Sequence, residues 1–222
     1  MIVAVEIKAV ISKYGSPKSS EKECGFDIMQ YACDGYRLII AKSGEGELAA
    51  AAAVQHLISK YNVDMVVNFG VVGGLTPEMS KARTCIVDRV VHYQFDLSEI
   101  DPVKAGQHTG YDDIYIYTDR TLYRKALSLY PNLVSVTCAS GDRFVGKAED
   151  KQALHRDFKA DICEMEAAGI ALTCDRSKVP YLMIKTVSDG ITGGAEEFLQ
   201  EVDRSADICL GIADSIIKSL NL

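Results

Sequence analysis

The sequence predicts an α/β fold, a three-layer α/β/α sandwich around a central mixed β-sheet. Short runs rich in Val, Ile, Tyr and Phe alternate with longer helical patterns along the whole chain. Several of these runs, such as VDMVVNF at 63–69 and YLMIKTV at 181–187, are almost entirely apolar, which is typical of strands buried on both faces. The runs 26–32 and 37–42 flank the turn dipeptide Asp34-Gly35, so we expect an antiparallel pair within the sheet.

The expected elements follow from these patterns. We expect strands over 2–6, 26–32, 37–42, 64–69, 84–91, 113–117, 133–138, 161–164 and 180–186. We expect helices over 46–60, 120–129, 148–157, 166–176 and 194–219. The last helix has one apolar stripe, at spacings of three, four and seven residues, which would pack against the sheet. Its members are Phe198, Val202, Cys209, Ala213 and Ile216.

The composition fits one ordinary globular domain over residues 1–222. The 222 residues are enough to bury a full core, and we see no linker or low-complexity break. Hydrophobic residues make up 48% and charged residues 25% of the chain, as in typical globular proteins. The net charge of −7 argues against nucleic acid as the main partner, because phosphate backbones select basic surfaces.

The same sequence features predict a cytoplasmic protein. The first ten residues already contain Glu6 and Lys8, and they lack the pattern of a secretory signal. No apolar stretch is long enough to cross a bilayer, so we expect no membrane association. The seven cysteines are scattered without CxxC spacing, which is typical of reduced thiols rather than of a zinc site. We therefore expect neither a metal nor a cofactor.

Candidate site residues lie in the segments that follow the predicted strands, since ligands of open α/β sheets bind beyond the carboxyl ends of the strands. The segment NFGVVGG at 68–74 ends an apolar strand with glycines, which either form a tight turn or let the backbone approach a ligand. The segment CASGDRFVG at 138–146 places Phe144 after a turn. Burial preferences favour a core position for Phe144 over a surface on which a base stacks.

Acidic residues follow two further strands. In CEMEAAGIA, alternation points Glu164 and Glu166 to one side and Met165 to the other. These carboxylates either stabilise a helix N-terminus or accept hydrogen bonds from a ribose diol. In IKTVSDG, Asp189 either belongs to a turn or protonates a leaving group from the rim of the crevice. Glu6 and Lys8, two residues apart, either reach the pocket or pair on the surface.

Taken in order, six segments resemble the family of methylthioadenosine/S-adenosylhomocysteine nucleosidases and their purine phosphorylase relatives. They are GEGELAAAAA, NFGVVGGL, VVHYQFDLS, ASGDRFV, EMEAAGIA and VPYLMIKTVSDG. The resemblance runs from about residue 1 to 219 and implies a purine nucleoside, of the adenosine type, as substrate. It also implies a homodimer or larger homo-oligomer in which the partner subunit closes the pocket.

The resemblance implies a role for each matching residue. Phe144 would stack on the purine, and the backbone of Val145 would face the edge of the base. Asp189, steadied by Ser188, would donate a proton to purine N7, so that the base leaves neutral as the sugar gains oxocarbenium character.

The sugar and the glycine segment have their own set of residues. Glu166 would accept hydrogen bonds from the ribose hydroxyls, and Met165 would pack beneath the sugar. Glu164 beside them, and Val71 and Gly73 of the glycine segment, are further candidates for substrate contact.

Three positions depart from the family pattern. Lys8 stands where the nucleosidases have the glutamate that activates water, and a protonated lysine cannot act as that base. Glu6, two residues earlier, would replace it after a small register shift. Val71 stands where a serine is usual, and Lys185 stands where arginine is frequent.

These residues favour hydrolysis of the N-glycosidic bond over phosphorolysis. The Gly-Asp-Pro segment and the arginines with which the related phosphorylases hold phosphate are not found here, and a phosphate dianion needs several cationic or N–H donors. Two alternatives stay open: a phosphorylase with an unusual phosphate site, and a nucleoside-binding or storage relative that has lost catalysis.

Overall fold

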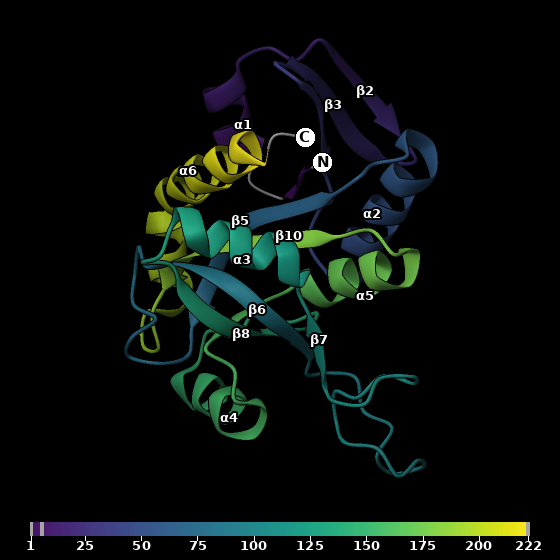
Figure 1. Cartoon of the computed structure of the whole chain (residues 1–222). Helices are drawn as coiled ribbons and strands as arrows, with labels where there is room; N and C mark the ends of the chain where they lie inside the picture. Colours follow the sequence, from purple (N-terminus) through teal and green to yellow (C-terminus); the bar gives the residue numbers. More distant parts are fainter. Residues whose placement is uncertain (1, 5–6, 221–222) are drawn as a thin grey trace.

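Strands and helices alternate along the chain in the computed structural model, which describes residues 2–4 and 7–220 (Figure 1). The strands are β1 (Ile2–Ala4), β2 (Ser19–Glu23), β3 (Phe26–Cys33), β4 (Tyr36–Lys42), β5 (Val66–Gly74), β6 (Thr84–His92), β7 (Tyr115–Tyr117), β8 (Val134–Ser140), β9 (Ile162–Glu164) and β10 (Tyr181–Asp189). The helices are α1 (Ile7–Tyr14), α2 (Glu47–Tyr61), α3 (Arg120–Leu129), α4 (Ala148–Phe158), α5 (Ala167–Ser177) and α6 (Gly194–Ser219).

All the strands belong to one mixed sheet, in the order β10-β6-β8-β9-β5-β1-β4-β3-β2, with β7 beside β6. The predicted hairpin is confirmed, because β3 and β4 pair antiparallel up to the Cys33–Tyr36 pair. The strand β10 also pairs parallel with β5, so β5, β10, β6, β8 and β9 form a closed ring of strands. The sheet therefore curls where these five strands pair, which brings the ends of several strands together.

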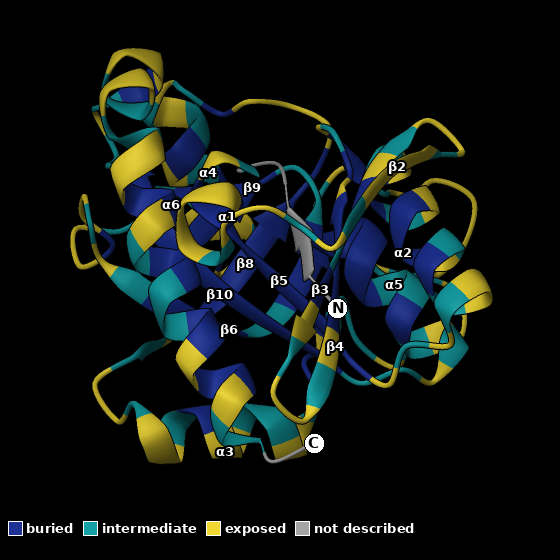
Figure 2. Cartoon of the chain, turned by 90° about the horizontal axis from the view of Figure 1, so that it is seen from above, coloured by how far each residue is buried: buried dark blue, intermediate teal, exposed yellow. Residues whose placement is uncertain are grey.

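Helices cover the two faces of the sheet, which confirms the predicted sandwich (Figure 1). Alternate residues of each strand point to opposite faces. On β4, Ile39 packs into the cluster formed by α2 and α5, whereas the next residue, Ile40, packs into the cluster formed by α1 and α6. Figure 2 shows the central strands buried between the helices, whereas the edge strand β2 is largely exposed.

Three regions differ from the predicted elements. Residues 19–23 form the edge strand β2, which was not predicted. Residues 7–14 form helix α1, because Ala9 and Val10 are buried against α6, and this segment was expected to leave the first strand in an extended conformation. The strand predicted over 64–69 continues through the glycines to Gly74, since β10 and β9 pair with that end. A Cβ atom on Gly74 would lie 1.8 Å from the carbonyl oxygen of Met79, so close packing explains this glycine. Within the described residues, no helix is long and apolar enough to span a membrane.

Candidate active site

A cavity of about 120 Å³ lies where β5, β9 and β10 end, beside the start of α6. Its lining residues are Glu45, Val71, Val72, Gly73, Phe144, Cys163, Glu164, Met165, Glu166, Ser188, Asp189 and Phe198. Every substrate-binding residue predicted from the sequence lines this cavity except Val145, and so does the predicted acid Asp189. The curled sheet therefore brings together residues that are far apart in the sequence.

A larger hollow, of about 620 Å³, lies elsewhere, between the segment after β5 and the start of β8. Its walls are mainly apolar, and two of its polar side chains are already hydrogen-bonded to the backbone. Asp161 accepts a hydrogen bond from the backbone N–H of Thr137 at 2.8 Å, and His155 lies 2.7 Å from the carbonyl oxygen of Ala160. We therefore place the chemistry in the smaller cavity, where carboxyl groups gather.

Asp189 ends β10 and is only 1% exposed. Its Oδ1 accepts a hydrogen bond from the Ser188 hydroxyl at 2.9 Å, which is the contact that the family resemblance implies. Its Oδ2 lies 2.5 Å from the ammonium nitrogen of Lys151, a helix residue that is fully buried. Burial raises the pKa of Asp189 above its ordinary value, while Lys151 and Ser188 oppose that rise.

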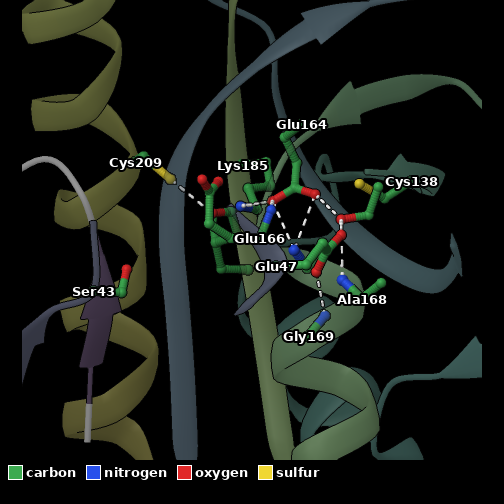
Figure 3. A network of polar contacts seen from close by, with 12 residues as sticks. Ser43, Glu47, Cys138, Glu164, Glu166, Ala168, Gly169, Lys185 and Cys209 are labelled. Carbon is green, nitrogen blue, oxygen red and sulfur yellow. Dashed lines mark hydrogen bonds and ion pairs between the residues drawn. The ribbon is translucent and has the colours of Figure 1, made fainter. Parts of the chain in front are cut away.

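Glu164 ends β9 and stabilises the start of α5 (Figure 3). Its carboxylate accepts hydrogen bonds from the backbone N–H groups of Glu166 at 3.1 Å and of Ala167 at 3.0 Å. It also accepts a hydrogen bond from Ser140 at 2.5 Å and pairs with the Lys185 ammonium at 3.1 Å. These contacts occupy its oxygens, so the structure favours the helix-stabilising interpretation over substrate contact for Glu164.

Glu47 is a second buried carboxyl group of this network (Figure 3). Its carboxyl group contacts the Ser140 hydroxyl and the backbone N–H of Gly169. Ser140 also touches Glu164 and accepts the N–H of Ala168 at 3.0 Å, so its one hydrogen cannot serve both carboxyl groups. The Lys185 ammonium lies against Glu164 and not against Glu47, so we assign to Glu47 the proton that its contact with Ser140 needs. Burial, and then the charge of Glu164, raise the pKa of Glu47 to about 8.

Glu166 is tied to the start of α2. Its Oε1 accepts a hydrogen bond from the backbone N–H of Gly46 at 2.9 Å. Gly46 has φ of 98°, and a Cβ atom there would lie 2.8 Å from Asp142 Oδ1, so only glycine fits without strain. Asp142 in turn accepts the N–H of Glu47 at 2.7 Å. The GEG segment thus fixes Glu166 beside the cavity by a backbone contact.

Phe144 forms part of the cavity wall rather than the core. It is 44% exposed, so the core position favoured by burial preferences is wrong. Its ring meets the ring of Phe198 edge to face, with centroids 5.5 Å apart. The neighbouring Val145 side chain is buried in a small cluster with Leu75 and Leu154 and does not line the cavity. That its backbone faces a base stays a prediction.

Lys8, which was predicted to be catalytic, does not line the cavity. Lys8 lies on the outer side of α1, where its exposed ammonium pairs with Asp203 at 3.2 Å, and it lines a different surface hollow. The structure therefore places Lys8 on a helix and away from the cavity, and a catalytic role for it stays an untested prediction. Glu6 lies outside the described residues.

Sequence reasoning missed six residues in or beside the cavity: Glu45, Glu47, Val72, Lys151, Cys163 and Phe198. Phe198 was assigned to the apolar stripe of the last helix. Lys151 lies in AEDKQALHRDF, which looks solvated, although its spacing of three from Leu154 places it on the buried side of that helix. Glu45 and Glu47 belong to the sequence GEGE at 44–47, whose composition alone gave no sign that the carboxyl group of Glu47 is buried.

The fold and the cavity define an α/β protein of the type that binds small ligands at the carboxyl ends of its strands. The model of the Phosphorylase superfamily matches residues 3–218, and this chain belongs to that family.

Curated relatives are nucleosidases. The 5'-methylthioadenosine/S-adenosylhomocysteine nucleosidase of Hydrogenovibrio crunogenus is 32% identical over 191 residues, which cover 82% of this chain and 81% of that protein. The aminodeoxyfutalosine nucleosidase of Campylobacter jejuni is 29% identical over 181 residues, covering 78% and 77%.

Solved structures share the fold. The 5'-methylthioadenosine/S-adenosylhomocysteine nucleosidase of Colwellia psychrerythraea in complex with adenine has a TM-score of 0.87 and 25% identity, covering 98% of this chain and 93% of that one. A futalosine hydrolase mutant of Helicobacter pylori has a TM-score of 0.93 and 23% identity, covering 98% and 97%.

Proposed function

We propose that this protein is a nucleosidase that hydrolyses the N-glycosidic bond of an adenosine-type nucleoside. The observation that carries the proposal is a single cavity that combines the buried acid Asp189, the carboxylate of Glu166 and the half-exposed ring of Phe144. The curated relatives named above hydrolyse such nucleosides according to their names. The 5'-group of the substrate is the point at which those names differ.

Each of the three residues has a chemical task in this proposal. Phe144 stacks on the purine, and Asp189 delivers a proton to N7 so that the base leaves neutral. Glu166 accepts hydrogen bonds from the ribose diol, with Met165 packed against the sugar. The positive charge that develops on the ribose is stabilised by the carboxylates around it.

The charge of the cavity favours water over phosphate as the second reactant. Four carboxyl groups line it, those of Glu45, Glu164, Glu166 and Asp189, and no lysine or arginine stands among the lining residues that the structure describes. The two buried lysines nearby are paired with Asp189 and Glu164. A phosphate dianion would meet repulsion there, whereas a cationic transition state would be stabilised.

Glu6 is our proposed base for the attacking water, on the sequence argument alone. A Glu6→Gln variant with unchanged turnover would remove this assignment, because a glutamine amide cannot accept the proton of water.

We also propose a homodimer or larger homo-oligomer in the cytoplasm. Large apolar side chains such as Leu48 and Ile100 are exposed, and association would cover them. The seven cysteines are free thiols, as in a reducing compartment. Sedimentation at two protein concentrations tests the association.

The decisive experiment is base release from methylthioadenosine, S-adenosylhomocysteine, aminodeoxyfutalosine, adenosine and inosine, each with and without phosphate. We expect adenine release that does not depend on phosphate. Release only with phosphate would establish a phosphorylase instead. Binding of these nucleosides without release would establish a binding or storage protein.

A further inference from the structure

The buried ion pair between Lys151 and Asp189 joins helix α4 to the cavity. The Lys151 side chain has no exposed surface, and its ammonium nitrogen lies 2.5 Å from Asp189 Oδ2 and 2.7 Å from the carbonyl oxygen of Gly190. Holding a fully buried lysine is costly unless its charge is paired. The two contacts fix the ammonium group at the end of β10, next to the acid of the proposed reaction.

The surrounding backbone leaves room for this pair. A Cβ atom on Gly73 would lie 3.3 Å from the Lys151 nitrogen, 3.3 Å from Asp189 Oδ2 and 3.1 Å from the Cys163 sulfur. Glycine at this position of β5 therefore lets both charged groups reach one another beneath the cavity. The pair is thus built into the sheet, since β5, β10 and α4 all contribute to it.

The other groups that face Asp189 cannot replace this cation. The Ser188 hydroxyl on β10 and the Cys163 thiol on β9 are neutral donors, and burial raises the pKa of that thiol to about 12. Glu197 on α6 accepts the N–H of Gly190 at 2.8 Å, and its negative charge opposes ionisation of Asp189. Lys151 therefore supplies the positive charge that these neighbours do not.

We propose that Lys151 is the positioning residue of Asp189: it orients the carboxyl group and sets the pH range over which that group can protonate the leaving base. This inference rests on the proposed function. In the reaction, the proton leaves the Asp189 carboxyl group and binds to purine N7, while the bond between N9 and C1′ breaks and its electron pair stays with the base. The cationic C1′ then forms a bond to the oxygen of water, whose proton passes to the base proposed above, Glu6. The Asp189 carboxylate that remains is stabilised by the Lys151 ammonium, and it regains a proton from solvent after the base departs.

Removing the Lys151 ammonium group should move the pH profile in a predictable direction. A buried Asp189 without its cation holds its proton to higher pH, because burial disfavours the carboxylate. The alkaline limb of kcat/KM, where an active acid is lost, therefore moves to higher pH. At the same time kcat falls on the plateau, because the carboxylate formed by proton transfer lacks its counter-charge.

The test is the pH profile of base release for wild type, Lys151→Met and Lys151→Arg. We expect the alkaline limb to move up by about one pH unit or more in K151M and to return toward the wild-type position in K151R. The exposed Lys159 at the end of the same helix provides the matched control, Lys159→Met, whose profile stays at the wild-type position. Lower activity in K151M with an unmoved limb would reduce Lys151 to a structural residue and overturn the proposal.

A second measurement tests the proposal without catalysis, so it also applies if a variant folds poorly or if the wild type is inactive. The number of protons taken up on adenine binding is measured by calorimetry in two buffers of different ionisation enthalpy, from pH 6 to pH 9, after thermal unfolding has shown that each variant is folded. A midpoint for proton uptake that moves in K151M supports the proposal, and an unmoved midpoint overturns it. If K151M does not fold, Lys151→Gln is measured in its place. Absence of base release by wild type would remove the proposed function and leave this binding test intact.

Discussion

The structure contains two buried lysine–carboxylate pairs that look alike and differ in what surrounds them. Lys185 pairs with Glu164 at 3.1 Å, and Lys151 pairs with Asp189 at 2.5 Å, all four side chains being buried. Glu164 also accepts two backbone N–H groups and a serine hydroxyl. Among the described residues, the side chains that donate to Asp189 are those of Lys151 and Ser188. A carboxylate that is satisfied on all sides stabilises a fold, and one that is partly satisfied at a cavity can exchange a proton with a ligand.

The largest effect that separates the two pairs is expected from Asp189→Asn. Loss of the acid should lower the rate of base release by about 10²–10⁴-fold, and the buried Lys151 ammonium, left without its partner, should also lower the melting temperature. Initial rates and thermal unfolding, measured on the same preparation, check this. A variant that unfolds instead of losing activity would place Asp189 with the structural pair.

Glu164→Gln should mainly lower the stability of the protein. The change leaves the Lys185 ammonium buried without its partner, which should lower the free energy of unfolding by about 3–5 kcal/mol. Chemical denaturation measures this loss. Full stability with a strong loss of substrate affinity would instead identify Glu164 as a substrate contact.

A smaller effect concerns the proton shared in the network of Glu164. Glu47, with a pKa of about 8 in the folded protein against an ordinary 4.5, keeps a proton that the unfolded chain releases between these values. Stability should therefore fall as pH rises from about 4.5 to 8, by on the order of 2–5 kcal/mol. Glu47→Gln should remove most of this slope, as followed by denaturation at several pH values. An identical slope in the variant would place the proton elsewhere.

The smallest effect is expected at Lys8. Its exposed pair with Asp203 should contribute less than about 0.5 kcal/mol, so Lys8→Met should leave both stability and base release close to wild type. Parallel assays of the two proteins suffice. A large loss of turnover would show that Lys8 takes part in the reaction.

The sequence predicted the layers and most of the cavity because both depend on local patterns. Apolar runs defined the strands, and the acidic residues at their ends, Glu164, Glu166 and Asp189, marked the carboxyl edge where ligands bind. The curled sheet was not predictable in this way, since the pairing of β10 with both β5 and β6 depends on contacts between distant segments.

The residues that the sequence did not predict also owe their positions to contacts between distant segments. Lys151 has the composition of a solvated helix around it, and its burial follows from how α4 packs on the sheet, with Gly73 leaving the space. The helix at 7–14 was missed because its two buried residues, Ala9 and Val10, give little periodic signal in a short segment. In both cases tertiary packing, rather than local preference, decides the conformation.

The closed ring of strands also has a consequence for how the protein reaches its working form. The last strand, β10, lies between β5 and β6, and its end pairs Asp189 with Gly73. A chain emerging from the ribosome therefore carries two open strand edges until residues 181–189 are made, and such edges invite wrong pairing. Because distant segments must meet before the ring closes, folding should be slow for a chain of this size, and catalytic competence would arrive only with its final step.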